Sequence, residues 1–369
     1  MTHTIRRSSL LKTGRSLAAL SLVVTLCQAC GRPTSAQAVT ALDFSRQIIG
    51  VEQKAAKVDQ GVPVIPDMTF GVPAPVIVER MKAMGVNLMT IPISRDDSRP
   101  TAEYVKRLKS NGGASLAIVI SDRKWGLDRE KNRREWAEGI ATCFHALEAA
   151  GCADMVKACR FDENDPLKGE PSTAPQWTER FNNIVQSMDL LNELTDGAFK
   201  RRTVLMHGEG YGSNFKGIRE AHVDSDFEAR MATRCSNYAF TFKHFDTGEP
   251  ADGKYASTEE WEAHFRNHSG LDEFAELGKP LMFVGNAGDG LFPNSLVQVP
   301  SPPRPWCNQI AALQRIFQQH GWHHFAFGPM IQPSDDKGRT VLHHAHGTRL
   351  ANRGTQLSDW LAWREGVTP

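Results

Sequence analysis

The chain lacks several features that would assign it to a broad functional class. Its 369 residues contain 43 Lys and Arg against 42 Asp and Glu, so the formal net charge is +1. No basic stripe is interleaved with aromatic residues, which argues against nucleic acid or an anionic membrane as the main partner. The sequence has no internal repeat, no low-complexity segment and no apolar run long enough for a transmembrane span.

Cysteine motifs are also missing. The cysteines beyond residue 38 are Cys143, Cys152, Cys159, Cys235 and Cys307. They form no CxxC motif and no Cys/His pair with metal-ligand spacing. In an oxidising compartment one pair could form a disulfide, whereas Cys159, inside a predicted strand, is interpreted as a buried small hydrophobic residue. The histidines within 343–346 cannot all face one ion, so we expect no metal and no cofactor.

The first 38 residues have the pattern of an export signal. Arg6 and Arg7 precede an apolar run at 17–26, which is too short to span a membrane. The paired arginines loosely suggest twin-arginine export. We therefore expect an export signal at 1–38, followed by one domain at 39–369.

Two processing sites compete in this segment. The residues Ala36-Gln37-Ala38 fit cleavage after small side chains. Residues 26–30 resemble a degenerate lipobox, in which Cys30 would carry a lipid anchor. The predicted location is therefore the periplasm, the exterior, or the outer membrane as a lipoprotein.

Apolar, strand-like runs alternate with amphipathic segments along the rest of the chain. The predicted strands are 47–52, 87–94, 114–122, 155–161, 203–208, 238–245, 280–285 and 323–330. The predicted helices are 75–84, 101–110 (with Thr101 as a possible cap), 132–150, 176–194, 227–234, 257–277, 305–320 and 356–364. Gly151, Gly278 and Gly321 follow three of these helices as typical stops. Eight β-α units predict an α/β fold, a (β/α)8 TIM barrel in a single domain. An open doubly wound sheet is the competitor, but no Gly-rich phosphate turn follows the first strand.

Polar and charged residues gather where the predicted strands end. These residues are Glu52; Arg95, Asp96 and Asp97; Asp122, Arg123 and Trp125; Asp162 and Glu163; His207, Glu209 and Tyr211; Lys243, His244 and Asp246; Asn286 and Asp289; and Gln332, Asp335 and Asp336. Barrel enzymes carry their chemistry at this end of the strands. Carboxylates, imidazoles and a Trp together suit a sugar site, with acids for the glycosidic oxygen and an aromatic plane for the ring.

Glycoside cleavage needs two carboxyl groups on opposite sides of the scissile bond, one of which holds a proton. Glu163, directly after the fourth predicted strand, is the candidate general acid. Glu209 is the first choice for the second carboxylate, followed by Asp246 and Asp289. The predicted substrate-binding residues are Glu52, Asp122, Trp125, Asp162, His207, Tyr211, His244 and Asn286.

The motif Arg-Phe-Asp-Glu at 160–163 resembles the strand-four motif of clan A-type barrel glycoside hydrolases, the cellulase-like and mannanase-like group. In that group strand four ends in Asn-Glu, the Glu being the acid/base, and strand seven ends in a nucleophilic Glu. The entry to strand seven at 279–283 is similar as well, and His244 resembles a His often found on strand six. Here Asp162 replaces the Asn. The resemblance implies cleavage of an oligo- or polysaccharide without a cofactor.

The chain departs from this family at strand seven, because residues 284–290 contain Asn286 and Asp289 but no Glu. Three alternatives remain open. The nucleophile has moved, with Asp289 as candidate; or the mechanism is inverting; or catalysis is lost and sugar binding is kept, as in a non-catalytic binding protein of an envelope or exopolysaccharide system. A less favoured alternative is a Schiff-base lyase that uses Lys243, since barrel aldolases carry a desolvated lysine on strand six.

Overall fold

The computed structural model of the chain describes residues 41–53, 78, 81–82, 85–93, 98–122, 127–161, 173–207, 214–244, 257–286 and 304–331. The chain divides into two units, Met1–Val39 and Thr40–Pro369, and the described residues all belong to the second. The predicted export signal and Cys30 lie outside the described residues.

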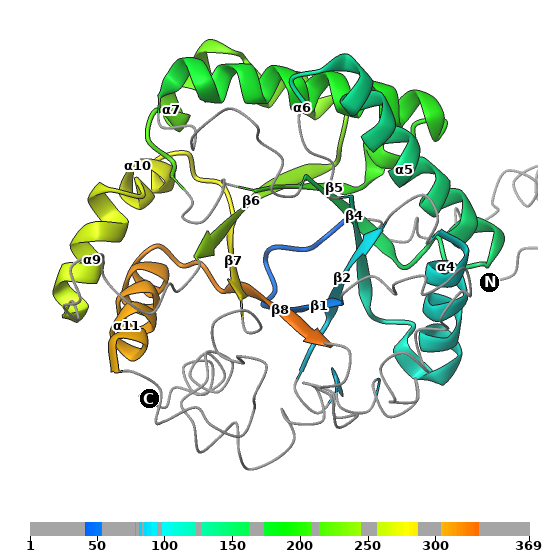
Figure 1. Cartoon of the computed structure of the whole chain (residues 1–369), viewed down its shortest axis with the longest axis horizontal. Coiled ribbons are helices and arrows are strands. Elements are labelled where there is room, and N and C mark those ends of the chain that lie inside the picture. Colours follow the sequence, from blue (N-terminus) through cyan, green and yellow to red (C-terminus); the bar gives the residue numbers. More distant parts are fainter. Residues whose placement is uncertain are drawn as a thin grey trace, which may run out of the picture. The chain divides into compact units, whose positions relative to one another are not determined.

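Eight parallel strands pair in chain order, and β8 pairs with β1, so that the sheet closes into a barrel (Figure 1). The strands are β1 (Ile48–Gln53), β2 (Leu88–Ile93), β3 (Ala117–Asp122), β4 (Val156–Phe161), β5 (Thr203–His207), β6 (Asn237–His244), β7 (Leu281–Asn286) and β8 (His324–Ile331). Each overlaps one predicted strand, and the predicted α/β barrel is confirmed. Parallel strands covered by helices are buried on both faces, which explains why they are apolar runs.

The described helices lie outside the ring of strands (Figure 1). They are α4 (Ser98–Leu108), α5 (Glu130–Ala149), α6 (Ala174–Leu194), α7 (Ile218–Asp224), α8 (Phe227–Ala232), α9 (Thr258–Asn267), α10 (Leu271–Ala275) and α11 (Arg304–Gln319), with short helical turns at Lys109–Gly113 and Ala198–Arg201. The predicted helix at 356–364 and most of that at 75–84 lie outside the described residues. None of the described helices is long and apolar enough to cross a membrane.

Three helix predictions were wrong in detail. The single helix predicted at 257–277 is two helices, because Gly270 adopts the left-handed φ of 67° and the Ser269 carbonyl accepts a hydrogen bond from Phe215 N (2.8 Å). The connection before β6 contains α7 as well as α8, and the left-handed Asp226 (φ 49°) separates them. Thr101 is not a cap, because α4 begins at Ser98.

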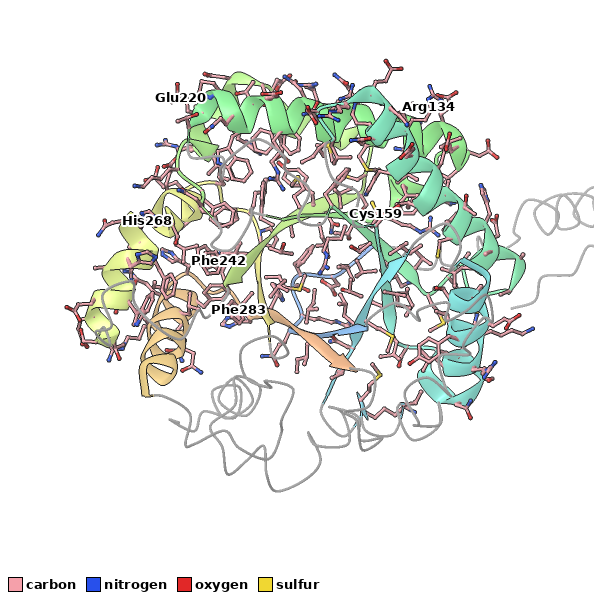
Figure 2. All side chains as sticks on the ribbon, in the orientation of Figure 1. Arg134, Cys159, Glu220, Phe242, His268 and Phe283 are labelled. Atoms are coloured by element: carbon pink, nitrogen blue, oxygen red, sulfur yellow. The ribbon has the colours of Figure 1, made fainter. Side chains whose placement is uncertain are left out.

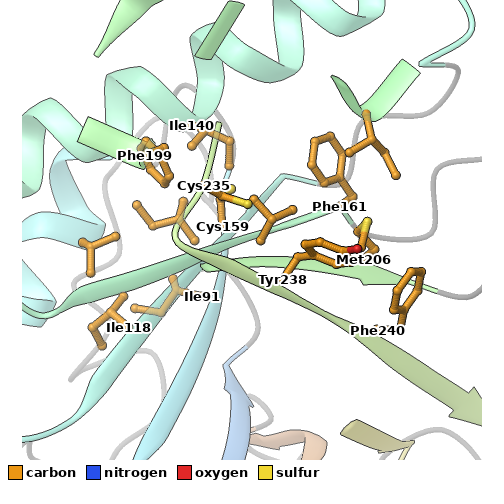
Figure 3. Close-up of a cluster of buried hydrophobic side chains, with 14 of the residues drawn as sticks. Ile91, Ile118, Ile140, Cys159, Phe161, Phe199, Met206, Cys235, Tyr238 and Phe240 are labelled. Atoms are coloured by element: carbon orange, nitrogen blue, oxygen red, sulfur yellow. The ribbon is translucent and has the colours of Figure 1, made fainter. Parts of the chain in front are cut away.

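A large apolar layer fills the space between strands and helices. Figure 2 shows Phe242, Phe283 and Cys159 on the inner side of the helices, with Arg134 and Glu220 on the outside. The close-up in Figure 3 shows Phe161, Met206 and Cys159 of neighbouring strands in one cluster with side chains of the covering helices. This packing holds the strand ends in fixed positions.

The four cysteines whose side chains the structure describes are buried in this layer and form no disulfide. Cys143, Cys152, Cys159 and Cys235 are all free thiols. The disulfide alternative is therefore wrong for these four, and the interpretation of Cys159 as a buried hydrophobic residue is confirmed. Burial raises the pKa of the Cys159 thiol, and it raises that of Cys235 to about 12, so both remain protonated.

Residues before β1 close the N-terminal end of the barrel. Leu42 is buried, its N–H donates to Thr203 Oγ1 (2.8 Å), and its carbonyl accepts from Asn237 Nδ2 (3.0 Å). Phe44 meets the His324 ring edge to face at 5.3 Å. We call residues 41–46 the plug.

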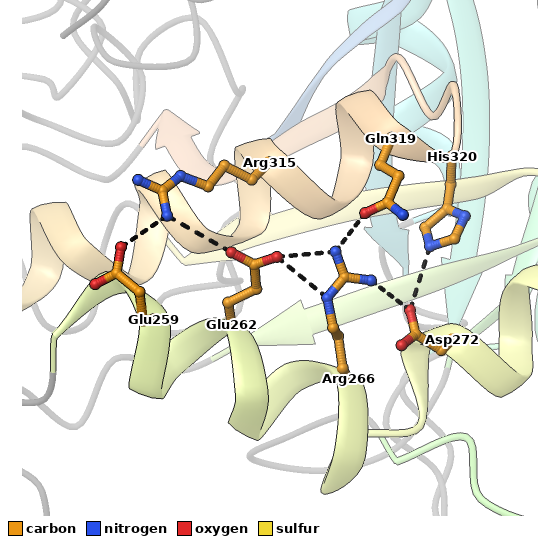
Figure 4. A network of polar contacts seen from close by, with 7 residues as sticks. All are labelled: Glu259, Glu262, Arg266, Asp272, Arg315, Gln319 and His320. Carbon is orange, nitrogen blue, oxygen red and sulfur yellow. Dashed lines mark hydrogen bonds and ion pairs between the residues drawn. The ribbon is translucent and has the colours of Figure 1, made fainter.

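Charged side chains join α9, α10 and α11 on the outside (Figure 4). Arg266 contacts Glu262 (2.9 Å) and Asp272 (2.6 Å), while Arg315 contacts Glu259 (3.0 Å) and Glu262 (3.6 Å). The network ties the two halves of the broken β6–β7 connection to the helix that precedes β8.

Candidate functional site

Closure of the barrel brings the C-terminal ends of all eight strands to one rim. The last strand residues are Gln53, Ile93, Asp122, Phe161, His207, His244, Asn286 and Ile331. Because neighbours in sequence are neighbours in space, the chain leaves the barrel at adjacent points after β4, β5, β6 and β7. The candidate site is this rim and the layer of side chains just below it.

Much of the barrel interior is apolar. Its members are Leu42, Ile48, Leu88, Val119, Ala158, Leu205, Ala239, Met282 and Val284. Such layers form a packed core and not a channel. Among the described residues, this packed interior leaves the rim as the place to look for a ligand site.

The interior becomes polar toward the rim. Arg160 of β4 is in register with Ser121 of β3 and Leu205 of β5. The strands of a barrel with a shear of about eight are tilted, so residues at the same height along the barrel axis are offset from the hydrogen-bonding register by about one residue per strand. Arg160 therefore lies at the height of Thr90 on β2 and Thr241 on β6. All three are buried, with exposures of 2%, 1% and 0%, and Ser121, one residue further along β3 than this height, has 0%.

Arg160 is the residue that the sequence-based reasoning missed. A barrel interior is usually filled by branched aliphatic side chains, and an arginine is rarely buried unless it is paired. The sequence did contain a signal for this position, because Arg160 is a charged residue near the end of a largely apolar strand. It lies two residues after Ala158 and so faces the same side of the sheet. Only the register across strands shows that this position is in the upper interior.

Phe161 fixes where β4 ends. Its ring stacks on Trp136 of α5 with centroids 4.1 Å apart and planes 15° from parallel. Phe161 thus faces the helices, while Arg160 occupies the alternate phase, toward the barrel axis. The acidic segment 162–165 begins directly after this anchored residue.

The connection after β5 is anchored at its far end. Phe215 N donates to Ser269 O (2.8 Å) and Lys216 N to Asn214 Oδ1 (2.9 Å). Gly217, the residue before α7, has φ 74°, and a Cβ there would lie 2.3 Å from Ala174 N. The segment 208–213, which holds Glu209 and Tyr211, therefore runs between β5 and a tightly packed corner of α6, α7 and α10.

Asp122 is the one predicted site residue whose side chain is described. Its carboxylate lies on the helix side of β3, where an added Cβ on Gly139 of α5 would come within 2.3 Å of Oδ2. Ile118 and Ile120, in the same alternation phase, pack in the outer layer. The structure thus does not bring the Asp122 carboxylate into the barrel interior.

Four predicted residues lie at described strand positions. Glu52 is in register with Thr90, His207 with Thr241, His244 with Gly285 and Asn286 with Gly328. Lys243, the alternative lyase residue, pairs with Val284. These positions are all at the C-terminal ends of their strands, as predicted.

The remaining predicted site residues lie outside the described residues. They are Trp125, Asp162, Glu163, Glu209, Tyr211, Asp246 and Asp289. Their roles stay predictions. Within the described ranges, no three His, Cys, Asp or Glu side chains are grouped so that they could hold a metal ion.

Comparisons with known proteins identify the fold. No protein-family model matches the sequence, and no curated protein matches it. A family 5 xyloglucanase from Paenibacillus pabuli superposes with a TM-score of 0.52 at 13% identity, over 89% of this chain and 99% of the other. A GH5-4 broad specificity endoglucanase from Clostridium longisporum gives 0.50 at 10% identity, over 85% and 94%. A D-psicose 3-epimerase from Clostridium cellulolyticum gives 0.41 at 8% identity, over 87% and 99%. The likeness to the xyloglucanase and the endoglucanase shows a TIM barrel, a fold that hosts many activities.

Proposed function

We propose that the protein is an exported glycoside hydrolase that cleaves an oligo- or polysaccharide by carboxylate acid/base catalysis. One observation carries the proposal. The closed barrel places the ends of β4, β5, β6 and β7 consecutively on one rim, and an acidic residue follows each end within a few residues. The superposed xyloglucanase and endoglucanase support it by fold-level analogy alone.

Glu163 is the general acid in this proposal. It follows the anchored Phe161, and β5, which carries Glu209 just beyond its end, is the next strand around the rim. Glu209, then Asp246, then Asp289 are the candidates for the second carboxylate. Trp125, Tyr211 and His244 would bind sugar rings and hydroxyls, together with Glu52, Asp162, His207 and Asn286.

The test is hydrolysis of a panel of soluble β- and α-glycans by the wild type and by Glu163→Gln. General acid catalysis contributes roughly 10²–10⁴-fold, so kcat should fall by that factor in the variant. Glu179→Gln, at an exposed position of α6, is the matched control and should retain full activity. Equal rates for Glu163→Gln and the wild type would rule out Glu163 as the acid.

The end of β7 bears on the mechanism. Asn286 is the last residue of the strand, and no Glu stands there. This favours an inverting reaction, in which the two carboxyl groups are roughly 6.5–9.5 Å apart to admit water, over a retaining one at about 5 Å. NMR of the first product anomer distinguishes the two outcomes.

The same observation supports a second candidate function, a non-catalytic carbohydrate-binding barrel. Calorimetry on the same glycans would then give binding without cleavage. Glu163→Gln would leave the affinity unchanged, since no proton transfer is involved.

A further inference from the structure

We propose that His264 and His268, at the C-terminal end of α9, form a surface site for a divalent transition-metal ion of the Cu²⁺ or Zn²⁺ type. The site lies on a helix outside the ring of strands, and it is independent of the proposed hydrolase function. The two imidazoles supply two ligands, and water completes the coordination of the ion.

The two histidines lie one helical turn apart. Residues four apart on a helix share one face, with Cβ atoms about 5–6 Å from each other. His268 follows the last residue of α9 but keeps helical backbone angles (φ −85°, ψ −47°), and its N–H donates to His264 O (2.7 Å). The same spacing of two histidines on one helix face binds zinc in helical zinc motifs.

The side chains are arranged as this spacing allows. The two imidazole rings stack with centroids 4.7 Å apart and planes 27° from parallel. The Trp261 ring lies edge to face with His264, at 5.5 Å, and so restricts the rotation of that imidazole. Zn–N bonds of about 2.0–2.1 Å place two nitrogens on one ion about 3 Å apart. Two rings this close reach that separation by small rotations about their χ bonds.

Both side chains can be reached from solution. His264 and His268 are exposed, and Figure 2 shows His268 on the outer side of the helical layer. The face of α9 that carries Glu262 and Arg266 is turned to α11 instead, where the charged network of Figure 4 occupies it. An ion would therefore bind to a face of α9 that this network leaves open.

Other described histidines use a ring nitrogen within the protein. They are His145, His222, His320 and His324, whose partners are a carbonyl, a tyrosine hydroxyl, a carboxylate and a backbone N–H. Within the described ranges, His264 and His268 make ring contacts, and no hydrogen bond or ion pair engages their ring nitrogens. These nitrogens are therefore available to a metal ion in the neutral form of the imidazole.

The ligand type determines which ions fit. Imidazole suits copper, nickel and zinc, and the affinity of a given site is highest for Cu²⁺ and lower for Zn²⁺. Mg²⁺ and Ca²⁺ take oxygen ligands and should not bind. The ion would link the last turn of α9 to the residue that follows it, just before the break at Gly270. Because the unfolded chain does not hold the two rings together, binding should raise the melting temperature.

The experiment is calorimetric titration of the full chain with CuCl₂ at pH 7.5, for the wild type, His264→Ala and His268→Ala. Each variant should bind one Cu²⁺ fewer per chain than the wild type, whatever the remaining histidines contribute. Titration with ZnCl₂ should show the same loss at lower affinity. Trp261 is a local reporter, because bound Cu²⁺ quenches the fluorescence of a nearby indole. Its quenching, obtained by difference from Trp261→Phe, should disappear in His268→Ala.

The matched control is the double variant Ala263→His/His264→Ala. It keeps the number of histidines but turns one ring by about 100° around the helix, away from His268. It should bind one Cu²⁺ fewer, like the single variants, whereas His145→Ala should bind as the wild type does. All of these positions are exposed, so the melting temperatures without metal should remain close to that of the wild type.

Two outcomes would overturn the proposal. Equal stoichiometry in the wild type and in His264→Ala or His268→Ala means that the pair holds no ion. A double variant that binds as many ions as the wild type means that the stacked arrangement is not what binds. Neither measurement depends on glycan cleavage, so the proposed hydrolase function can fail without affecting the metal site, and the reverse also holds.

Discussion

His324 illustrates how a single buried polar side chain ties stability to pH. It lies at the N-terminal end of the barrel and is 6% exposed, and its Nδ1 accepts a hydrogen bond from Ile48 N (3.3 Å). Burial lowers its pKa to about 4, with a smaller contribution from His323 and an opposing one from the Phe44 backbone. The ring is therefore neutral in the folded protein at neutral pH, and its role is structural.

This pKa predicts a loss of stability in mild acid. An unfolded chain takes up the proton near pH 6.5 and the folded protein only near pH 4, so the free energy of unfolding falls as pH decreases through that window. Across the whole window the free energy of unfolding falls by an amount on the order of 3 kcal/mol. Urea denaturation at pH 7 and pH 4.5 measures how far the free energy of unfolding falls between the two. This fall should be smaller for His324→Asn than for the wild type, since the Asn Oδ1 can still accept from Ile48 N but does not titrate. The exposed His145→Asn is the control, and a decrease as large in His324→Asn as in the wild type would contradict the assignment.

At the scale of elements, the corner of α6, α7 and α10 is closed by tight backbone packing around Gly217. Gly217, the residue just before α7, is in the left-handed region with φ 74°, and the backbone of Thr173 and Ala174 occupies the space a Cβ would need. Gly151 has nearly the same φ, 72°, but nothing lies within 4 Å of its Cβ position. A substitution at Gly151 therefore tests the cost of the left-handed backbone alone, whereas one at Gly217 adds a steric conflict.

Gly217→Ala should be much more harmful than Gly151→Ala. A left-handed alanine costs roughly 1–2 kcal/mol, which is the whole expectation for Gly151→Ala. At Gly217 the contact of 2.3 Å with Ala174 N adds an overpacking term of about 1–3 kcal/mol and displaces α7 from α6. Chemical denaturation of both variants measures the difference. Equal destabilisation would show that the corner accommodates the added methyl group without steric conflict.

At the scale of the whole molecule, periodicity and glycine stops were sufficient to locate all eight strands. Buried parallel strands are apolar on both faces, so each gives a continuous local signal. The break at Gly270 could not be predicted, because the apolar periodicity continues through 257–277 while the hydrogen bond from Phe215 to Ser269 is non-local.

The sequence predicted which residues lie at the rim of the barrel, but not which way their side chains face. Placement of residues at the strand ends followed from the fold, but the side of the strand that each residue faces depends on alternation phase and register. Asp122 was expected to bind substrate, and its carboxylate lies against Gly139. Arg160 was read as part of an apolar run, and the pairing with Ser121 and Leu205 shows it in the interior.

Closure of the barrel also depends on residues that precede β1. The plug inserts Leu42 below Ile48, and both backbone polar groups of Leu42 bond to side chains of β5 and β6. Thr203 Oγ1 donates in turn to Asn237 Oδ1 (2.5 Å), so the plug completes a partly buried ring of hydrogen bonds. Without the plug these groups and the apolar floor would meet water. A chain that starts at residue 47 should therefore be less stable than one that starts at residue 39, by at least about 3 kcal/mol, since loss of a buried Leu side chain alone costs about 2–5 kcal/mol.

Calorimetric melting of the two chains measures this difference, and Leu42→Ala in the longer chain should account for a large part of it. Arg46→Ala is the control within the plug, because its ion pair with Asp43 is exposed (84% and 47%) and such pairs contribute little to stability. Melting temperatures within a degree of each other for the two chains would show that the barrel floor closes without the plug. A clear loss with the shorter chain would instead make residues 41–46 an integral part of the barrel, so that any processing of the chain must cut before them.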